Sequence, residues 1–247
     1  MIGGCESMRA ALLVSDSDSR LLGTIGEAHP DLLLLDATGP DLAERARAGR
    51  AALPGVPVFI RISPLAEGSD GELDAAMRAR ANGIWLRNAA GRRAAEQLGA
   101  RIAVLEARLG IADGATGIVA SVESPVGALA ISSLAEAGPR LAGITWNRSA
   151  LSRALGCDPN PEAEMAEPLR AVRASLLLAA AAAGVPAIDS AAAGSEDFDR
   201  EASLARRDGF AAKLARDLGQ LAALKRLGAQ APLGRWMENF VSGVATK

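Results

Sequence analysis

The chain has 247 residues, of which 49% are hydrophobic, 23% are charged and 3% are aromatic. This composition fits a globular protein with a large aliphatic core and excludes disordered, collagen-like and fibrous proteins. The 27 Lys and Arg residues are balanced by 29 Asp and Glu residues, so the formal net charge is -2 and the sequence lacks the basic field of a nucleic-acid-binding protein.

Eight short aliphatic runs recur along the chain, and each is followed by a stretch with helical periodicity. This alternation is typical of a parallel sheet covered by helices. The predicted strands are 10–14, 31–36, 56–62, 83–86, 117–123, 141–146, 185–189 and 209–214. The predicted helices are 18–28, 40–52, 70–80, 90–109, 125–136, 161–183, 196–208 and 217–228.

This order of strands and helices predicts the α/β class and a single (β/α)8 TIM barrel over residues 1–230. The alternative is an open doubly wound sheet, but no GxGxxG segment follows a predicted strand. Residues 231–247 are predicted to form an extra C-terminal helical tail that packs on the barrel or on a neighbouring subunit, because apolar side chains recur there at helical spacing. These side chains are Trp236, Met237, Phe240 and Val241.

Cysteine content and hydropathy indicate in which cellular compartment the protein is expected. Cys5 and Cys157 are too few for a disulfide framework and lack the CxxC spacing of a structural zinc site. No apolar run reaches the roughly 18 residues of a membrane span, and the first residues lack the features of a secretory signal. We therefore expect a cytoplasmic protein with neither membrane nor nucleic acid among its partners.

Charged residues stand at the ends of several predicted strands, where a TIM barrel builds its active site. We expect Asp36, Arg61, Glu123 and Asp189 at one rim of the barrel, and Lys213 lies within the last strand. An acid alone at a strand end is more often a helix cap or a loop anchor than a catalytic group. Position alone therefore leaves the roles of Asp36 and Asp189 open.

Arg61 and Glu123 are the strongest candidates in this set for binding a ligand or a metal ion. Arg61 interrupts the apolar run VFIRI, and its guanidinium needs an anion, either a ligand or a neighbouring carboxylate such as Asp36 or Glu123. Glu123 follows an apolar strand, and its carboxylate would suit Mg2+ together with substrate oxygens and water. The single histidine, His29, precedes the second strand and so belongs to the opposite face, which argues against a histidine base or a His-rich metal site.

Several segments taken together resemble one known family. They are VFIRISPL, GIVASVESPVGALAISSLAEAGPRLAGITWNRSALSRALG, LLLAAAAAGVPAIDS and DREASLARRDGFAAKLA. In order and spacing they are similar to the HpcH/HpaI aldolase and citrate lyase family, and most to its citrate lyase beta-subunit branch. The resemblance implies a homo-oligomeric TIM barrel that uses Mg2+ to cleave or form carbon–carbon bonds in CoA thioesters such as citryl and malyl thioesters, or in 2-oxo acids.

Three positions keep the residue types of the family's site. Arg61, in RISPL, falls on the substrate-binding arginine of the family's RxNPL segment. Glu123 falls on its first metal-binding glutamate, and Asp36 falls on the last acid of its DLED segment. The resemblance therefore implies that Arg61 and Asp36 are catalytic and that Glu123 binds the metal.

Five segments depart from the family pattern on this same face. GAEDL, which supplies the second metal ligand, reads NRSAL, with Ser149 and Ala150 in place of the two acids. PKxE reads RNAA from Arg87, and HPxQ reads DLGQ with Asp217 in place of the histidine. DLED and FVPG read LLLD and LVSD. The hydrophobic frame persists, so these departures weaken the ancestral chemistry without threatening the fold.

Three functional hypotheses follow. The first is a carbon–carbon lyase in which Glu123 holds a weakly bound Mg2+ while Arg61 and Asp36 act on the substrate. The second is a non-catalytic barrel that binds an acidic metabolite, or a partner subunit, through Arg61. The third is metal-free chemistry by Arg148, Arg87 and Asp217. In the metal-free cases, Arg61 and Arg148 are the predicted substrate-binding residues, because both are guanidinium groups on the functional face.

Overall fold

The computed structural model describes residues 8–15, 29–37, 41–65, 70–157, 165–190 and 198–228. The strands are β1 Arg9–Val14, β2 Leu32–Asp36, β3 Val58–Ile62, β4 Gly83–Leu86, β5 Gly117–Val122, β6 Leu141–Trp146, β7 Ala187–Asp189 and β8 Ala212–Ala215. The helices are α1 Leu42–Ala52, α2 Asp70–Arg78, α3 Arg92–Leu109, α4 Pro125–Leu129, the 3-10 helix η2 Ile131–Glu136, α5 Arg148–Leu155, α6 Glu167–Ala183, α7 Phe198–Asp208 and α8 Leu218–Gly228.

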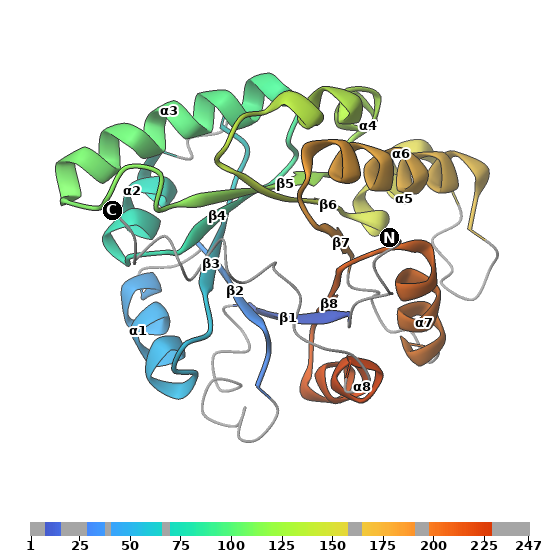
Figure 1. Ribbon diagram of the computed structural model, residues 1–247, viewed down its shortest axis with the longest axis horizontal. Helices are drawn as coiled ribbons and strands as arrows, with labels where there is room; N and C mark the ends of the chain where they lie inside the picture. Colours follow the sequence, from blue (N-terminus) through green and yellow to red (C-terminus); the bar gives the residue numbers. More distant parts are fainter. Residues whose placement is uncertain are drawn as a thin grey trace, which may run out of the picture.

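The eight strands are parallel and close into a barrel in the order of the chain, with helices around the outside (Figure 1). This confirms the predicted TIM barrel. Strands β3 and β7 begin two residues later than predicted, after Pro57 and Pro186. Each proline joins its neighbouring strand through its carbonyl oxygen alone, which accepts from the Leu33 and Ile144 amides respectively. Proline has no N–H to give to the ladder, so the regular strand begins after it.

The described helices differ from prediction in three places. The predicted helix 125–136 is split into α4 and η2, α5 was not predicted, and α6 begins at Glu167 although a helix was predicted from residue 161. Pro125 starts α4 and the Ser124 hydroxyl accepts from the Gly127 amide, which is a regular N-terminal cap. The predicted helix 18–28 and the tail 231–247 lie outside the described residues. Among the helices that are described, none is long and apolar enough to cross a membrane.

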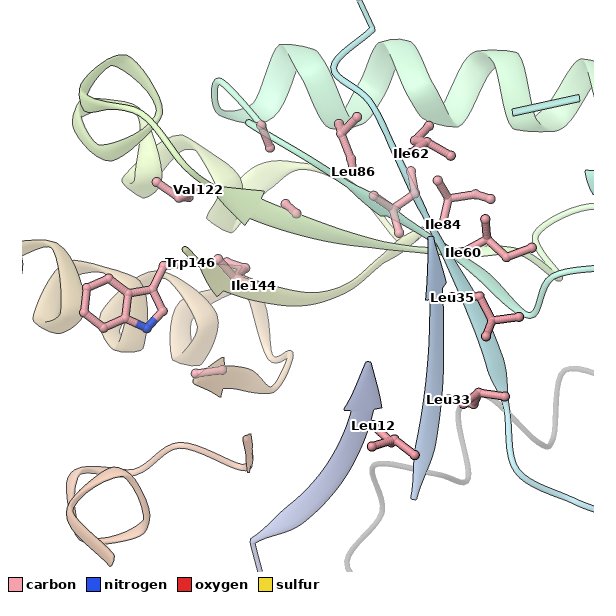
Figure 2. Packing of buried hydrophobic residues seen from close by; sticks show 14 of the residues in the cluster. Leu12, Leu33, Leu35, Ile60, Ile62, Ile84, Leu86, Val122, Ile144 and Trp146 are labelled. Atoms are coloured by element: carbon pink, nitrogen blue, oxygen red, sulfur yellow. The ribbon is translucent and has the colours of Figure 1, made fainter. Parts of the chain in front are cut away.

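The core has two layers because successive side chains of a strand point to opposite sides of the sheet. Figure 2 shows the outer layer, in which side chains such as Leu33, Ile60 and Trp146 lie between the strands and the helices. The inner layer fills the barrel. Its members are Ala11, Leu13, Leu32, Leu34, Phe59, Trp85, Val119, Ile188, Ala212 and Leu214.

The same alternation determines which polar residues reach the mouth of the barrel. Two residues beyond the inner side chains Leu34, Phe59, Trp85 and Ser121 come Asp36, Arg61, Arg87 and Glu123. All four therefore project inward at the carboxyl ends of β2, β3, β4 and β5, the end where TIM barrels carry out their chemistry.

The opposite end of the barrel is held by a buried carboxylate. Glu106, at the end of α3, accepts from the Thr116 and Gly114 amides at 2.8 and 3.1 Å and from Arg140 Nη2 at 2.7 Å. Burial opposes the charged form, but these hydrogen bonds outweigh it and lower the pKa of Glu106 below its usual value. This group fastens the loop before β5 and belongs to the stability face.

Candidate functional site

Asp36 and Arg61 form a two-pronged ion pair across neighbouring strands. They are direct partners in the β2–β3 register. Arg61 Nε donates to Asp36 Oδ1 at 2.5 Å, and Nη2 donates to Oδ2 at 2.7 Å. Such a bidentate contact fixes the plane of the guanidinium. Within the described residues Arg61 Nη1 has no hydrogen-bond partner, so this edge of the group is left for a ligand.

Glu123 is held by a hydroxyl and a second guanidinium. Ser121 Oγ donates to Glu123 Oε1 at 2.9 Å inside the barrel. Arg87 Nε and Nη2 both lie 3.5 Å from Glu123 Oε2, the long end of the hydrogen-bonding range. The Glu123 side chain is 7% exposed and the Arg87 side chain is 44% exposed. The carboxylate is therefore buried beneath an arginine that solvent can reach.

The four residues form an ordered arc at the mouth. Around the barrel from β2 to β5 come Asp36, Arg61, Arg87 and Glu123, which is the charge order minus, plus, plus, minus. Each guanidinium is paired with the carboxylate on its outer side, so the two guanidinium groups stand on adjacent strands between the two acids. We call these four residues the mouth arc. Its net charge is zero, but its centre is positive.

The segment NRSAL forms the start of α5 on the next strand around the barrel. Asn147 Oδ1 accepts from the Ala150 amide at 3.0 Å, a regular N-terminal cap. Arg148 Nη1 lies 3.3 Å from Glu201 Oε1 of α7. The side chain of Arg148 thus points toward α7, whereas that of Arg61 pairs with Asp36 of β2. Substrate binding by Arg148 stays a prediction.

Asp189 ends β7 and is the register partner of Lys213, which lies within β8, but the side chains of both residues point into the outer layer. Asp189 accepts from Lys213 Nζ at 2.7 Å and from Trp146 Nε1 at 2.9 Å. Lys213 also donates to the Ser190 carbonyl at 3.0 Å and lies 5.5 Å from the centre of the Phe198 ring. Asp189 is at the same end of the barrel as the mouth arc but faces the helices instead of the mouth.

The pKa of Asp189 reflects this setting. Burial opposes its charged form, but the Lys213 ammonium and the hydrogen bonds from Lys213 and Trp146 outweigh burial and lower the pKa. Asp217, which replaces the histidine of the family's HPxQ segment, caps α8, because its Oδ1 accepts from the Gln220 amide at 2.8 Å.

A magnesium ion does not fit the mouth arc as it stands. Both Asp36 oxygens accept from Arg61, and Glu123 is engaged by Ser121 and Arg87. Ala150 offers no side-chain oxygen. Within the described ranges no three His, Cys, Asp or Glu side chains gather as a metal site would require. A divalent ion beside Glu123 would also meet the Arg87 guanidinium, which carries the same sign of charge.

Two contacts of Glu123 were not predicted from the sequence, one with the Ser121 hydroxyl and one with the Arg87 guanidinium. Ser121 is the one polar side chain of the strand GIVASV and precedes Glu123 by two residues. Two residues apart on a strand means the same side of the sheet. That spacing was the signal that could have paired the two side chains.

Comparisons with known proteins agree with this fold. The family model described as HpcH/HpaI aldolase/citrate lyase matches residues 9–221. A search of the curated proteins found no match.

Three solved structures show how widely the same fold is shared. RipC from Yersinia pestis is 24% identical, with a TM-score of 0.64, and the alignment covers 92% of this chain and 96% of that one. The citrate lyase beta subunit of Mycobacterium tuberculosis complexed with oxaloacetate and magnesium is 21% identical, with a TM-score of 0.68 and coverages of 91% and 98%. CitE from Mycobacterium tuberculosis with magnesium, acetoacetate and coenzyme A is 20% identical, with a TM-score of 0.68 and coverages of 98% and 90%.

Proposed function

Because the chain belongs to the HpcH/HpaI aldolase/citrate lyase family, we propose that its barrel mouth binds a small acidic metabolite directly and that the magnesium-dependent carbon–carbon lyase reaction is impaired in it. The main observation behind this proposal is that the two carboxylates at the mouth, Asp36 and Glu123, already form ion pairs with Arg61 and Arg87. A metal-dependent relative needs such carboxylates free to hold the ion.

Arg61 is the group that would hold the acid. Its guanidinium is fixed by Asp36, and Nη1 has no partner within the described residues, so binding a carboxylate costs little further ordering. Asp36 is therefore a positioning residue in this proposal. A guanidinium grips a carboxylate well but does not polarise a carbonyl as a divalent ion does, so binding survives where catalysis is weakened.

The nature of the ligand follows from the relatives only as a class. Two structures from Mycobacterium tuberculosis contain oxaloacetate or acetoacetate, and the structure with acetoacetate also contains coenzyme A. We propose a small organic acid, either free or as a CoA thioester, as the ligand here. We also propose that the protein is a cytoplasmic homo-oligomer, on the grounds of its low cysteine content and the resemblance to its family.

Calorimetric titration tests this proposal. Oxaloacetate and L-malate are titrated into the protein in EDTA and, separately, in Mg2+, and turnover of malyl-CoA and citryl-CoA is followed in both buffers. We expect saturable binding in EDTA and little or no turnover. Binding that requires Mg2+, or turnover that EDTA abolishes, would restore the metal-dependent lyase.

A paired variant tests the role of Arg61. Arg61→Met combined with Asp36→Asn removes both charges of the pair and leaves no unpaired acid. We expect it to abolish binding while the protein stays folded by circular dichroism. The control is Arg78→Met, which breaks an exposed pair with Asp74 on α2. Equal binding in the two variants contradicts the assignment of Arg61.

A further inference from the structure

We propose that Arg87 is a second anion-binding residue, so that the mouth arc selects a small dicarboxylate and holds one carboxylate on each guanidinium. This inference rests on the proposed function and deepens it, because it names the class of acid. Arg87 stands where the family's PKxE segment begins with proline, so the resemblance assigns it no role.

The backbone places Arg87 beside Arg61. The Arg87 amide donates to the carbonyl of Ile62, the residue after Arg61, at 3.2 Å. Asn88 follows with a positive φ of 47°, a conformation that asparagine tolerates, and this turns the chain away directly after Arg87. Both guanidinium groups therefore belong to one stretch of rim, with Cα atoms roughly 8 Å apart by strand geometry.

Arg87 also has donors to spare. An arginine carries five N–H donors, and the contacts of Arg87 with Glu123 are two long ones to a single oxygen. Its side chain is nearly half exposed, so a ligand can reach it. Glu123, held from below by Ser121, is in turn a positioning residue that keeps this guanidinium at the mouth.

The charges of the arc explain why a dianion is preferred. Two guanidinium groups on adjacent strands repel each other, and their carboxylate partners lie on the outer sides, not between them. A ligand with two negative charges neutralises both guanidinium groups at once, whereas a monoanion leaves one guanidinium without a ligand carboxylate. Two separate carboxylates also match two separated guanidinium groups better than the single centre of a phosphate does.

The test compares ligands that differ by one charge. Malonate, succinate and glutarate are titrated in EDTA against their monoamides, which have nearly the same shape, and against inorganic phosphate. We expect the best dicarboxylate to bind at least about tenfold more tightly than its monoamide, since each charge-assisted contact adds at least that much. Phosphate that binds as tightly as the best dicarboxylate overturns the assignment.

Variants of Arg87 then test whether this residue causes the preference for a dicarboxylate. In Arg87→Met the dicarboxylate should bind no more tightly than the monoamide, and the affinity for the monoamide should change less than about twofold. Arg87→Met with Glu123→Gln gives a second, charge-balanced variant in case the single one does not fold. Arg78→Met should keep the preference.

The outcomes separate this inference from the proposed function. If no acid binds the unaltered protein, the proposed function is wrong. If dicarboxylates and monoamides bind alike, and the Arg87 variants keep both affinities, the proposed function stands and the role of Arg87 is wrong.

Discussion

The Lys213 ammonium lies 2.7 Å from the Asp189 carboxylate in the outer layer of the barrel, where the two side chains are 2% and 9% exposed. Trp146 donates to the other oxygen of the same carboxylate. One ion pair therefore joins β6, β7 and β8 beneath α7, in a place where water cannot replace a lost partner.

Removing one member of this pair should destabilise the protein strongly. Lys213→Met leaves the buried Asp189 carboxylate without its ammonium partner, and we expect the free energy of unfolding to fall by about 3–5 kcal/mol. Lys213→Met with Asp189→Asn should recover much of that loss, since the amide oxygen can still accept from Trp146. Urea denaturation measures both. The control is Arg78→Met, which breaks the exposed pair with Asp74 and should lower the free energy of unfolding by less than about 1 kcal/mol.

Stability should fall in acid because of Glu106 and Asp189. Both groups have a pKa lowered by folding, so their stabilisation is complete above the pKa of the unfolded chain and is lost as the pH falls through the folded pKa. We expect the free energy of unfolding to decline from about pH 5 downward. Urea titrations at several pH values measure this decline. Glu106→Gln should flatten the profile, and a profile parallel to that of the parent protein contradicts the role of Glu106.

Gly83 should not tolerate a side chain. A Cβ at this position would lie 2.1 Å from Phe59 Cε1 inside the barrel. Phe59 is fully buried, so Gly83→Ala should cost about 1–3 kcal/mol through overpacking. Gly71→Ala on α2 is the matched control, because nothing lies within 4 Å of its added Cβ and helix propensity favours alanine. Equal melting temperatures for the two variants would refute the packing argument.

The strands were predictable because each is an aliphatic run bounded by glycine, proline or polar residues. Helix α5 was not, since its eight residues follow β6 after only Asn147 and are too short to show clear periodicity. The Asn147 cap was its one strong signal. Short helices of this kind depend on capping and tertiary packing.

The site was partly predictable, because charged residues stand at the ends of the predicted strands. Strand ends identified Asp36, Arg61, Glu123 and Asp189, and the structure brings the first two together as one of the two pairings that the sequence left open. The sequence did not reveal that Asp189 faces outward. Strands buried on both sides show no alternation of polar and apolar residues, so the direction of a side chain depends on register.

Restoring a magnesium site should require the removal of Arg87. The parent protein is expected to bind Mg2+ in the millimolar range or not at all. Ser149→Glu with Ala150→Asp returns the acids of the family segment to the first turn of α5, where acids also suit the helix dipole. In this double variant the Arg87 guanidinium still lies beside Glu123, so we expect little gain in Mg2+ affinity.

Adding Arg87→Met to the double variant frees the Glu123 oxygen, and Mg2+ affinity should then rise at least about tenfold, because even weaker changes around a metal have effects of that size. Calorimetric titration with Mg2+ measures all three proteins, and Arg78→Met in the double background controls for loss of a positive charge. An equal gain in the double variant would mean that Arg87 does not block the ion. No gain in the triple variant would mean that NRSAL does not occupy the place of the family's metal-binding segment.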